Sequence, residues 1–166
     1  IKADASNVVG VYIKDLQSGQ EFVFNGNTAF SAQGWLKIAL LVEVYRQLGD
    51  AAAPELRSHL LELITTDNKG AGDEVLAQLG KGDISAGLAQ FNDVFRQLGL
   101  KNTFMAQPFV QRVTPVFVVT PGNAGAELRP SLDPNAQSTV IDIGLLLESV
   151  DQCRKNAGSF SVVFGG

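Results

Sequence analysis

Lys37 holds the most unusual position in this sequence for a charged residue. It lies in the stretch Phe-Ser-Ala-Gln-Gly-Trp-Leu-Lys (30–37), which runs directly into Ile-Ala-Leu-Leu-Val (38–42). The apolar positions from Trp35 to Leu48 cover most of the circumference of a helix, and this pattern predicts a buried central helix. A cation in the first turn of a helix is disfavoured by the helix dipole. Either the aliphatic stem carries the ammonium to the surface, or the charge serves a chemical purpose.

The spacing around Lys37 resembles a known nucleophile motif. Phe-x-x-x-Ser-x-x-Lys at the start of a buried helix is typical of class A β-lactamases, penicillin-binding proteins and related serine hydrolases. Phe30 and Lys37 fit this motif, but Gly34 stands where the family has its serine. In the family the serine hydroxyl attacks a carbonyl and the lysine helps to remove its proton. Ser31 does not replace that serine, because it lies six residues before Lys37 and off the one-turn spacing.

A second stretch, Thr66-Asp67-Asn68, resembles the Ser-Asp-Asn loop of the same family. There the hydroxyl shuttles a proton to the leaving group, and the asparagine holds the substrate amide and the motif lysine. Thr66 keeps the hydroxyl, and Asn68 matches. By itself an Asp-Asn pair before glycine indicates only a turn or a helix cap. The resemblance therefore implies a remnant site of Lys37, Thr66 and Asn68, with Gly34 at the nucleophile position.

The remaining candidates for chemistry are single residues. His59 is the only histidine, and no carboxylate or hydroxyl is spaced to work with it, so we interpret it as a boundary residue of a helix. Cys153 is the only cysteine and falls on an apolar stripe, which favours a small buried side chain over a reactive thiol. No cysteine or histidine cluster indicates a metal, and we expect no cofactor.

Composition narrows the class of protein. The chain has 166 residues, which suits a single domain over residues 1–166 with a real core. A net charge of -4 argues against nucleic-acid binding, and the longest apolar run, residues 38–42, is too short to span a membrane. The sequence begins with Ile1 and shows no signal peptide, so a mature form is one interpretation. The resemblance implies an extracytoplasmic or secreted location.

The expected fold class is α+β, a mainly helical domain around the central helix with an N-terminal β-hairpin. Alternating β-branched residues predict a strand over 7–16, a Ser-Gly turn and a returning strand over 21–24. Pro54 indicates the start of a helix that runs to about Thr66. A second helix is predicted to begin at the cap Asp83 and to end at Gly99. A third is predicted to begin at Ser138-Thr139, with Asp142 as the partner of the cap, and to run to about Asn156. Residues 121–137 form the longest predicted loop, and an apolar run at 116–119 is of strand type.

The resemblance extends to Leu-Gly-Leu-Lys-Asn-Thr (98–103), but the match to the family is incomplete. Glu127 is the acidic residue in the region of the family's omega loop, and its neighbours do not match, so the deacylation base is not assigned to it. The family has further strands after this region, one of which carries a Lys-Thr-Gly motif, and residues 1–166 show no counterpart of them. The resemblance therefore implies that the hairpin belongs to an incomplete β-lactamase-like sheet. An exposed hairpin, to which residues 160–164 could add a strand, predicts a homodimer.

Three hypotheses remain for function. The first is a non-catalytic β-lactamase-like domain with a binding or structural role, whose partner is a cell-wall peptide or a protein. The second is a fragment or inactivated form of a serine hydrolase that acts on β-lactams or peptidoglycan peptides. The third is an unrelated helical interaction domain.

Overall fold

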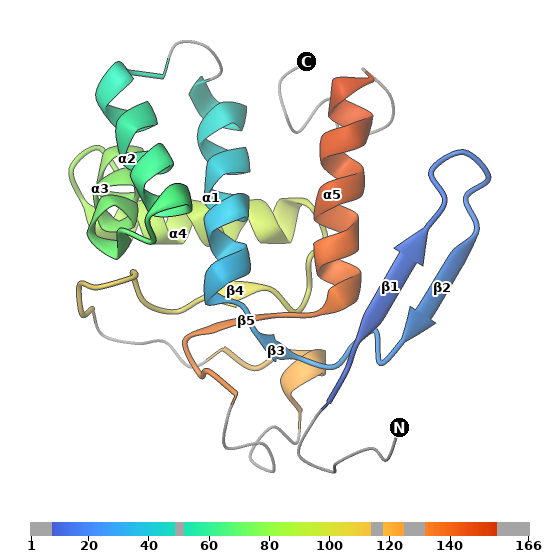
Figure 1. The fold of residues 1–166 in the computed structure, drawn as a ribbon. Coiled ribbons are helices and arrows are strands. Elements are labelled where there is room, and N and C mark those ends of the chain that lie inside the picture. The colour runs from blue at the N-terminus through green and yellow to red at the C-terminus, as the bar shows by residue number, and fades with distance from the viewer. Residues whose placement is uncertain (1–7, 49–51, 114–117, 125–131, 156–166) are drawn as a thin grey trace.

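The computed structural model describes residues 8–48, 52–113, 118–124 and 132–155, and the fold is α+β as expected. Five α-helices lie in these ranges: α1 (Gln33–Leu48), α2 (Pro54–Thr65), α3 (Lys69–Leu79), α4 (Ile84–Gln97) and α5 (Val140–Arg154). The strands are short and form two antiparallel sheets (Figure 1). One is the hairpin of β1 (Val11–Lys14) and β2 (Glu21–Phe24), and the other joins β3 (Phe30–Ser31), β5 (Ala136–Ser138) and β4 (Phe104–Met105) in that order.

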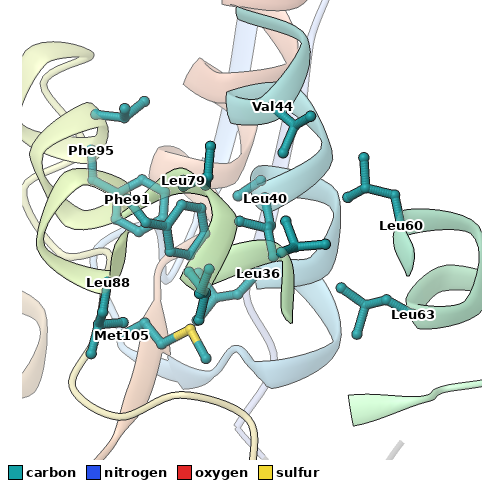
Figure 2. Close-up of a cluster of buried hydrophobic side chains, with 14 of the residues drawn as sticks. Leu36, Leu40, Val44, Leu60, Leu63, Leu79, Leu88, Phe91, Phe95 and Met105 are labelled. Atoms are coloured by element: carbon teal, nitrogen blue, oxygen red, sulfur yellow. The ribbon is translucent and has the colours of Figure 1, made fainter. Parts of the chain in front are cut away.

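The hydrophobic core is organised around α1, as the apolar pattern predicts. Its side chains at 36, 40 and 44 are fully buried, and they lie between Leu60 and Leu63 of α2 and the rings of Phe91 and Phe95 of α4 (Figure 2). The two rings pack edge to face, with centroids 4.7 Å apart. The helix is not buried on all sides, however. Ile38, Tyr45 and Leu48 are exposed, because the neighbouring elements leave one face of α1 uncovered.

The predicted helix boundaries follow their caps. The side chain of Asp83 accepts hydrogen bonds from the N–H groups of Ser85 and Ala86 at the start of α4. Gly99, just after α4, has a φ of 75°, the left-handed conformation that glycine adopts without strain. Thr139 caps α5 by accepting from the N–H of Asp142, as predicted, and this helix ends at Arg154.

Two glycine positions allow α3 and α4 to pack with their backbones in contact. A Cβ atom on Gly87 would lie 1.8 Å from the carbonyl oxygen of Leu76. A Cβ atom on Gly80 would lie 1.9 Å from the carbonyl oxygen of Asp83. No side chain fits at these distances, so α3 is held at a fixed position beside α4.

The hairpin packs against α5 through one of its two faces. Lys14 forms an ion pair with Glu148 of α5 at 2.8 Å, and Tyr12 lies so close to Gly144 that no Cβ would fit there. Hydrogen bonds from Lys14 to Glu148 and Glu21 hold the pKa of the Lys14 amine above its usual value. The opposite face carries apolar side chains that are more than half exposed, namely Val9, Ile13, Phe22 and Phe24. Within the described ranges no further strand pairs with either edge of the hairpin.

The small sheet β3-β5-β4 is the part of the fold that the sequence analysis missed. Residues 121–137 were expected to form one long loop, but they contain the 3-10 helix η2 (Pro121–Asn123) and the start of β5. Two of these strands have two residues and the third has three, so they are too short to show an alternating pattern. The apolar run at 116–119 was expected to be of strand type, but residues 118 and 119 are not in a strand. Residues 116 and 117 and the segment 160–164 lie outside the described residues.

The prediction of an apolar buried stripe on α5 is wrong in part. Leu146 is buried, whereas Leu147 and Val150 are exposed, and Cys153 is half-buried with a free thiol. Leu147 lies on the side of α5 that faces the hairpin, where it lines an open pocket with residues of β1, so this apolar position stays exposed beside its neighbour.

Candidate active site

Gly34 lies in the first turn of α1, at the point where the resemblance places a nucleophile. The chain enters the helix from β3, and Ala32 is fixed by a hydrogen bond from its N–H to the carbonyl of Ala136 in β5. Gly34 is exposed, and a Cβ atom added to it would meet no heavy atom within 4 Å. The fold therefore has room for a side chain at position 34, and steric crowding does not account for the glycine.

Lys37 lies one turn after Gly34, and its ammonium binds the carboxylate of Asp67. The Lys37 side chain is only 17% exposed, whereas that of Asp67 is 60% exposed. The hydrogen bond from Lys37 lowers the pKa of Asp67, and the positive charges of Lys37 and Lys69 lower it further. The partly buried cation thus has a counter-ion, and its stem does not need to extend into bulk water.

Thr66 and Asn68 flank Asp67 in the turn between α2 and α3. The Thr66 hydroxyl donates a hydrogen bond of 2.8 Å to the backbone carbonyl of Glu62, which belongs to the last turn of α2. The Asn68 side chain caps α3 by accepting from the N–H of Ala71, and its amide donates to the Glu62 carboxylate at 2.9 Å. The structure thus brings Lys37 to the Thr-Asp-Asn turn through its contact with Asp67. The hydrogen bonds of Thr66 and Asn68 described above connect them only to nearby residues of α2 and α3.

Asp67 has a backbone conformation that brings its side chain into this arrangement. Its φ is 55°, in the left-handed region that residues other than glycine, asparagine and aspartate seldom adopt. The turn thereby changes direction sharply between the end of α2 and the start of α3. The sequence marks Asp67 only as part of a motif, since its contact with Lys37 depends on a turn conformation that no local pattern indicates.

A cavity of about 170 Å³ lies between the beginnings of α1 and α3. We call it the α1–α3 cavity. It is lined by Gln33 of α1, Lys69 of α3, the segment Met105, Gln107 to Phe109 and Arg112, and Asn135 with Ala136. Gln33 adjoins Gly34, and Lys69 adjoins Asn68, so the cavity borders the remnant site without including its residues.

One buried carboxylate that the sequence analysis did not single out holds a wall of this cavity in place. Asp73 of α3 is 8% exposed and accepts backbone N–H groups from Phe109 at 2.6 Å, Val110 at 3.0 Å and Gln111 at 2.6 Å. The ring of Phe109 packs directly against Gly72, so closely that a Cβ atom at position 72 would clash with it. The loop that carries Arg112 is therefore attached to α3 at two points. No local pattern marks Asp73, because its partners lie about one quarter of the chain away.

The other candidate residues show no arrangement for catalysis in the described part of the chain. His59 is half-buried on α2, as expected of a boundary residue, and among the described residues its Nδ1 has no hydrogen-bond partner. Ser31 lies in β3, and its hydroxyl accepts from the N–H of Asp133 at 2.8 Å. Glu127 lies outside the described residues. No group of three or more histidine, cysteine, aspartate or glutamate side chains in the described ranges is placed to hold a metal ion.

Comparison with known proteins agrees with the resemblance over the first part of the chain. Residues 1–82 match the family model of the β-lactamase enzyme family. This match supports a β-lactamase-like family. It includes Gly34, Lys37 and the Thr-Asp-Asn turn, and it ends just before α4. No curated protein and no solved structure matched the chain significantly. No helix in the described ranges has the length and apolar character needed to cross a membrane.

Proposed function

We propose that this chain is a β-lactamase-like domain that has lost hydrolysis and has a binding or structural role. The observation that carries the proposal is Gly34. It lies one turn before Lys37, at the place of the nucleophile in the resembled motif, and it has no side chain that could attack a carbonyl. Loss of the nucleophile of a covalent hydrolase lowers kcat by about 10⁶-fold.

The ion pair of Lys37 supports the same proposal. A lysine that accepts a proton from a neighbouring hydroxyl must spend part of its time as a free amine. Here the ammonium of Lys37 is bound to the carboxylate of Asp67, so the side chain is already engaged in a contact between two parts of the fold. Lys37 therefore acts in this proposal as a structural cation that joins α1 to the Thr-Asp-Asn turn.

The experiment is labelling by a fluorescent penicillin, followed by denaturing electrophoresis. We expect no covalent label on the native chain. We expect at most trace label and trace nitrocefin turnover from Gly34→Ser, because the introduced hydroxyl would face a lysine already paired with Asp67. Stable labelling of the native chain would refute the proposal, and Gly34→Ala is the control for any change caused by a side chain at this position.

The alternative is an inactivated serine hydrolase acting on β-lactams or peptidoglycan peptides, and one observation favours it. The open space around Gly34 means that a serine can be accommodated without repacking. Under this alternative, Gly34→Ser would restore nitrocefin hydrolysis at the rate of an ordinary β-lactamase. The same experiment thus distinguishes a domain adapted to binding from an enzyme that lacks only its nucleophile.

We also propose that the protein forms a homodimer through its hairpin. Four apolar side chains on one face of β1 and β2 and the preceding residues are more than half exposed, and burying one such side chain contributes about 1.5–3 kcal/mol. An open strand edge also offers unpaired backbone groups to a second copy. A cell-wall peptide or another protein is the partner that the binding role itself would require.

Light scattering coupled to size-exclusion chromatography tests the dimer. We expect a dimer at high micromolar concentration that becomes a monomer in Phe22→Thr. Leu61→Gln is the matched control, because Leu61 is 63% exposed on α2, away from the hairpin. A monomer at every concentration, or equal dissociation in the control variant, would rule out the hairpin as an interface.

A further inference from the structure

A groove lies between β1 and α5, on the side of β1 that faces away from β2 (Figure 1). We call it the β1–α5 groove. Its volume is about 500 Å³, it is open to solvent, and no residue of β2 lines it. The exposed lining is mostly apolar and includes Val11 of β1 with Val140 and Ile143 of α5. Two further lining leucines, Leu16 and Leu147, are 50% and 52% exposed, so the groove leaves apolar surface in water that an occupant would cover.

The free edge of β1 adds unpaired backbone groups to this groove. Alternate residues of an antiparallel strand direct their N–H and C=O groups toward the partner strand. The N–H of Asp15 donates to the carbonyl of Gln20 at 2.9 Å, so Asp15 and, two residues earlier, Ile13 are directed toward β2. Tyr12 and Lys14 therefore direct their backbone groups to the opposite edge. Within the part of the chain that the structure describes, these groups have no hydrogen-bond partner.

The charged side chains of the groove are already paired with each other. Lys14 and Glu148 both line it, and they form an ion pair at 2.8 Å. Lys14 also contacts Glu21 at 3.0 Å, and Glu148 accepts a hydrogen bond from the side chain of Gln152 at 3.0 Å. An occupant therefore gains from backbone hydrogen bonds and from the burial of apolar side chains, and not from a new ion pair. These are the two contributions that an added β-strand makes.

A second copy of the chain does not fit this groove through its own β1. The helix α5 packs against the Tyr12 and Lys14 side chains, beside the edge at which the two strands would meet. Two antiparallel β1 strands related by a two-fold axis would lie about 4.8 Å apart, with both α5 helices on the same face of the joined sheet. The axes of packed helices need about 8–10 Å between them. An extended segment without a helix on that face meets no such obstacle.

We propose that the β1–α5 groove binds an extended, uncharged peptide segment of a partner protein, which adds a strand antiparallel to β1. Its backbone would pair with the free N–H and C=O groups of Tyr12 and Lys14. Every second side chain of the segment would lie over Ile143 and Leu147 of α5. The opposite face of the hairpin, which the proposed homodimer uses, stays available.

The proposal specifies a partner for the proposed binding role, but it uses no residue of the remnant site. Failure of peptide binding would therefore leave the loss of hydrolysis, which penicillin labelling tests, unaffected. Conversely, a labelled native chain would refute the loss of hydrolysis without removing the groove or the free edge of β1.

The test is an NMR titration of the isotope-labelled full chain with the capped peptide acetyl-Val-Thr-Val-Thr-Val-amide. We expect saturable binding at millimolar concentration, with shifts in β1 and in the groove-lining part of α5. When the free peptide is at about ten times its Kd, the amide protons of Tyr12 and Lys14 should exchange about tenfold more slowly. Those of Val11 and Ile13 already bond to β2 and should change less. No saturable binding, or binding without protection at Tyr12 and Lys14, would overturn the proposal.

Two N-methylated versions of this peptide test the pairing at the strand edge. In an antiparallel pair, the residues whose side chains lie over α5 are also those whose N–H groups face β1. Methylation of the valine nitrogens removes these donors and should weaken binding by at least about tenfold. Methylation of the threonine nitrogens affects only the outer edge of the added strand and should change binding by less than about threefold. Equal binding of the two methylated peptides would overturn the proposed edge pairing.

Leu147→Gln and Val150→Gln form a matched pair of protein variants. Both positions are exposed on α5, so neither variant should unfold the protein, but only Leu147 lines the groove. Leu147→Gln should weaken peptide binding by about tenfold, because the peptide would no longer bury an apolar side chain there. Val150→Gln should change binding by less than about twofold. Equal weakening by the two variants, or unchanged binding in Leu147→Gln, would show that the peptide does not occupy the groove.

Discussion

Replacing Asp73 by asparagine should loosen the loop that carries Arg112 and destabilise the whole protein. The carboxylate accepts three backbone N–H groups from residues 109–111 at 2.6–3.0 Å. An asparagine side chain has one oxygen, and its NH₂ group would face an N–H donor. Each hydrogen bond to a charged group contributes about 1.5–3 kcal/mol. Because Val110 and Gln111 are exposed and water can replace part of this loss, we expect Asp73→Asn to cost about 2 kcal/mol and Asp73→Ala about 3 kcal/mol.

Urea denaturation and hydrogen exchange measure the two parts of this effect. For a domain of this size, 1 kcal/mol corresponds to about 2–4 °C in Tm, so Asp73→Ala should lower Tm by about 6–12 °C. The amides of residues 109–111 should lose protection more than those of α3 itself. Asp93→Asn is the control, since Asp93 pairs with Arg96 on the exposed face of α4 and should cost less than about 0.5 kcal/mol. Unchanged stability with unchanged protection of these amides would refute the assignment of Asp73 as the anchor of the loop.

Three further predictions concern positions where the structure gives a definite sign. Gly87→Ala should destabilise the protein by about 3 kcal/mol or more in urea denaturation, because the added Cβ would lie 1.8 Å from the carbonyl oxygen of Leu76. Gly34→Ala should instead stabilise it by about 0.5–1 kcal/mol, since the site is open and alanine is the better helix former, and a loss of stability would contradict the open geometry. The lowered pKa of Asp67 means that its ion pair with Lys37 stabilises the fold fully above pH of about 4 and that this contribution disappears as pH falls through the folded-state pKa. The stability difference between the native chain and Asp67→Asn should therefore shrink on acidification, and a difference independent of pH would show that the pair contributes nothing.

Local signals explain which parts of the fold were predictable from the sequence. The hairpin follows from alternating β-branched residues around a Ser-Gly turn, and its register places Ile13 opposite Phe22. The helices α2, α4 and α5 begin where Pro54, Asp83 and Thr139 indicate, because a cap acts on backbone groups within the next three residues. The hairpin and the starts of these helices are determined by residues that are close together in the sequence, so the sequence alone is enough to predict their positions.

Contacts between distant segments account for what the sequence did not reveal. The strands β3, β4 and β5 pair residues from 30 to 138, and none is long enough to show a period. Asp142 lies in the first turn of α5, but its carboxylate does not serve as a cap of that helix. It accepts hydrogen bonds from the N–H of Asn102 and the hydroxyl of Thr103, which lie forty and thirty-nine residues away. The family resemblance singles out residues 98–103, which include Asn102 and Thr103. It does not indicate that the buried carboxylate of Asp142 is their partner, because that contact exists only in the folded chain.

The candidate site shows the same division between local and distant determinants. The spacing of Gly34 and Lys37 places both on the first turns of α1, and this required only the helical period. The partner of Lys37 depends on the left-handed conformation of Asp67, which aspartate adopts with less strain than most residues that have a side chain. A glycine at position 67 would remove this strain, but it would also remove the carboxylate and leave a largely buried ammonium without its counter-ion. The presence of aspartate there is therefore explained by the charge of Lys37, whether or not the site performs any chemistry.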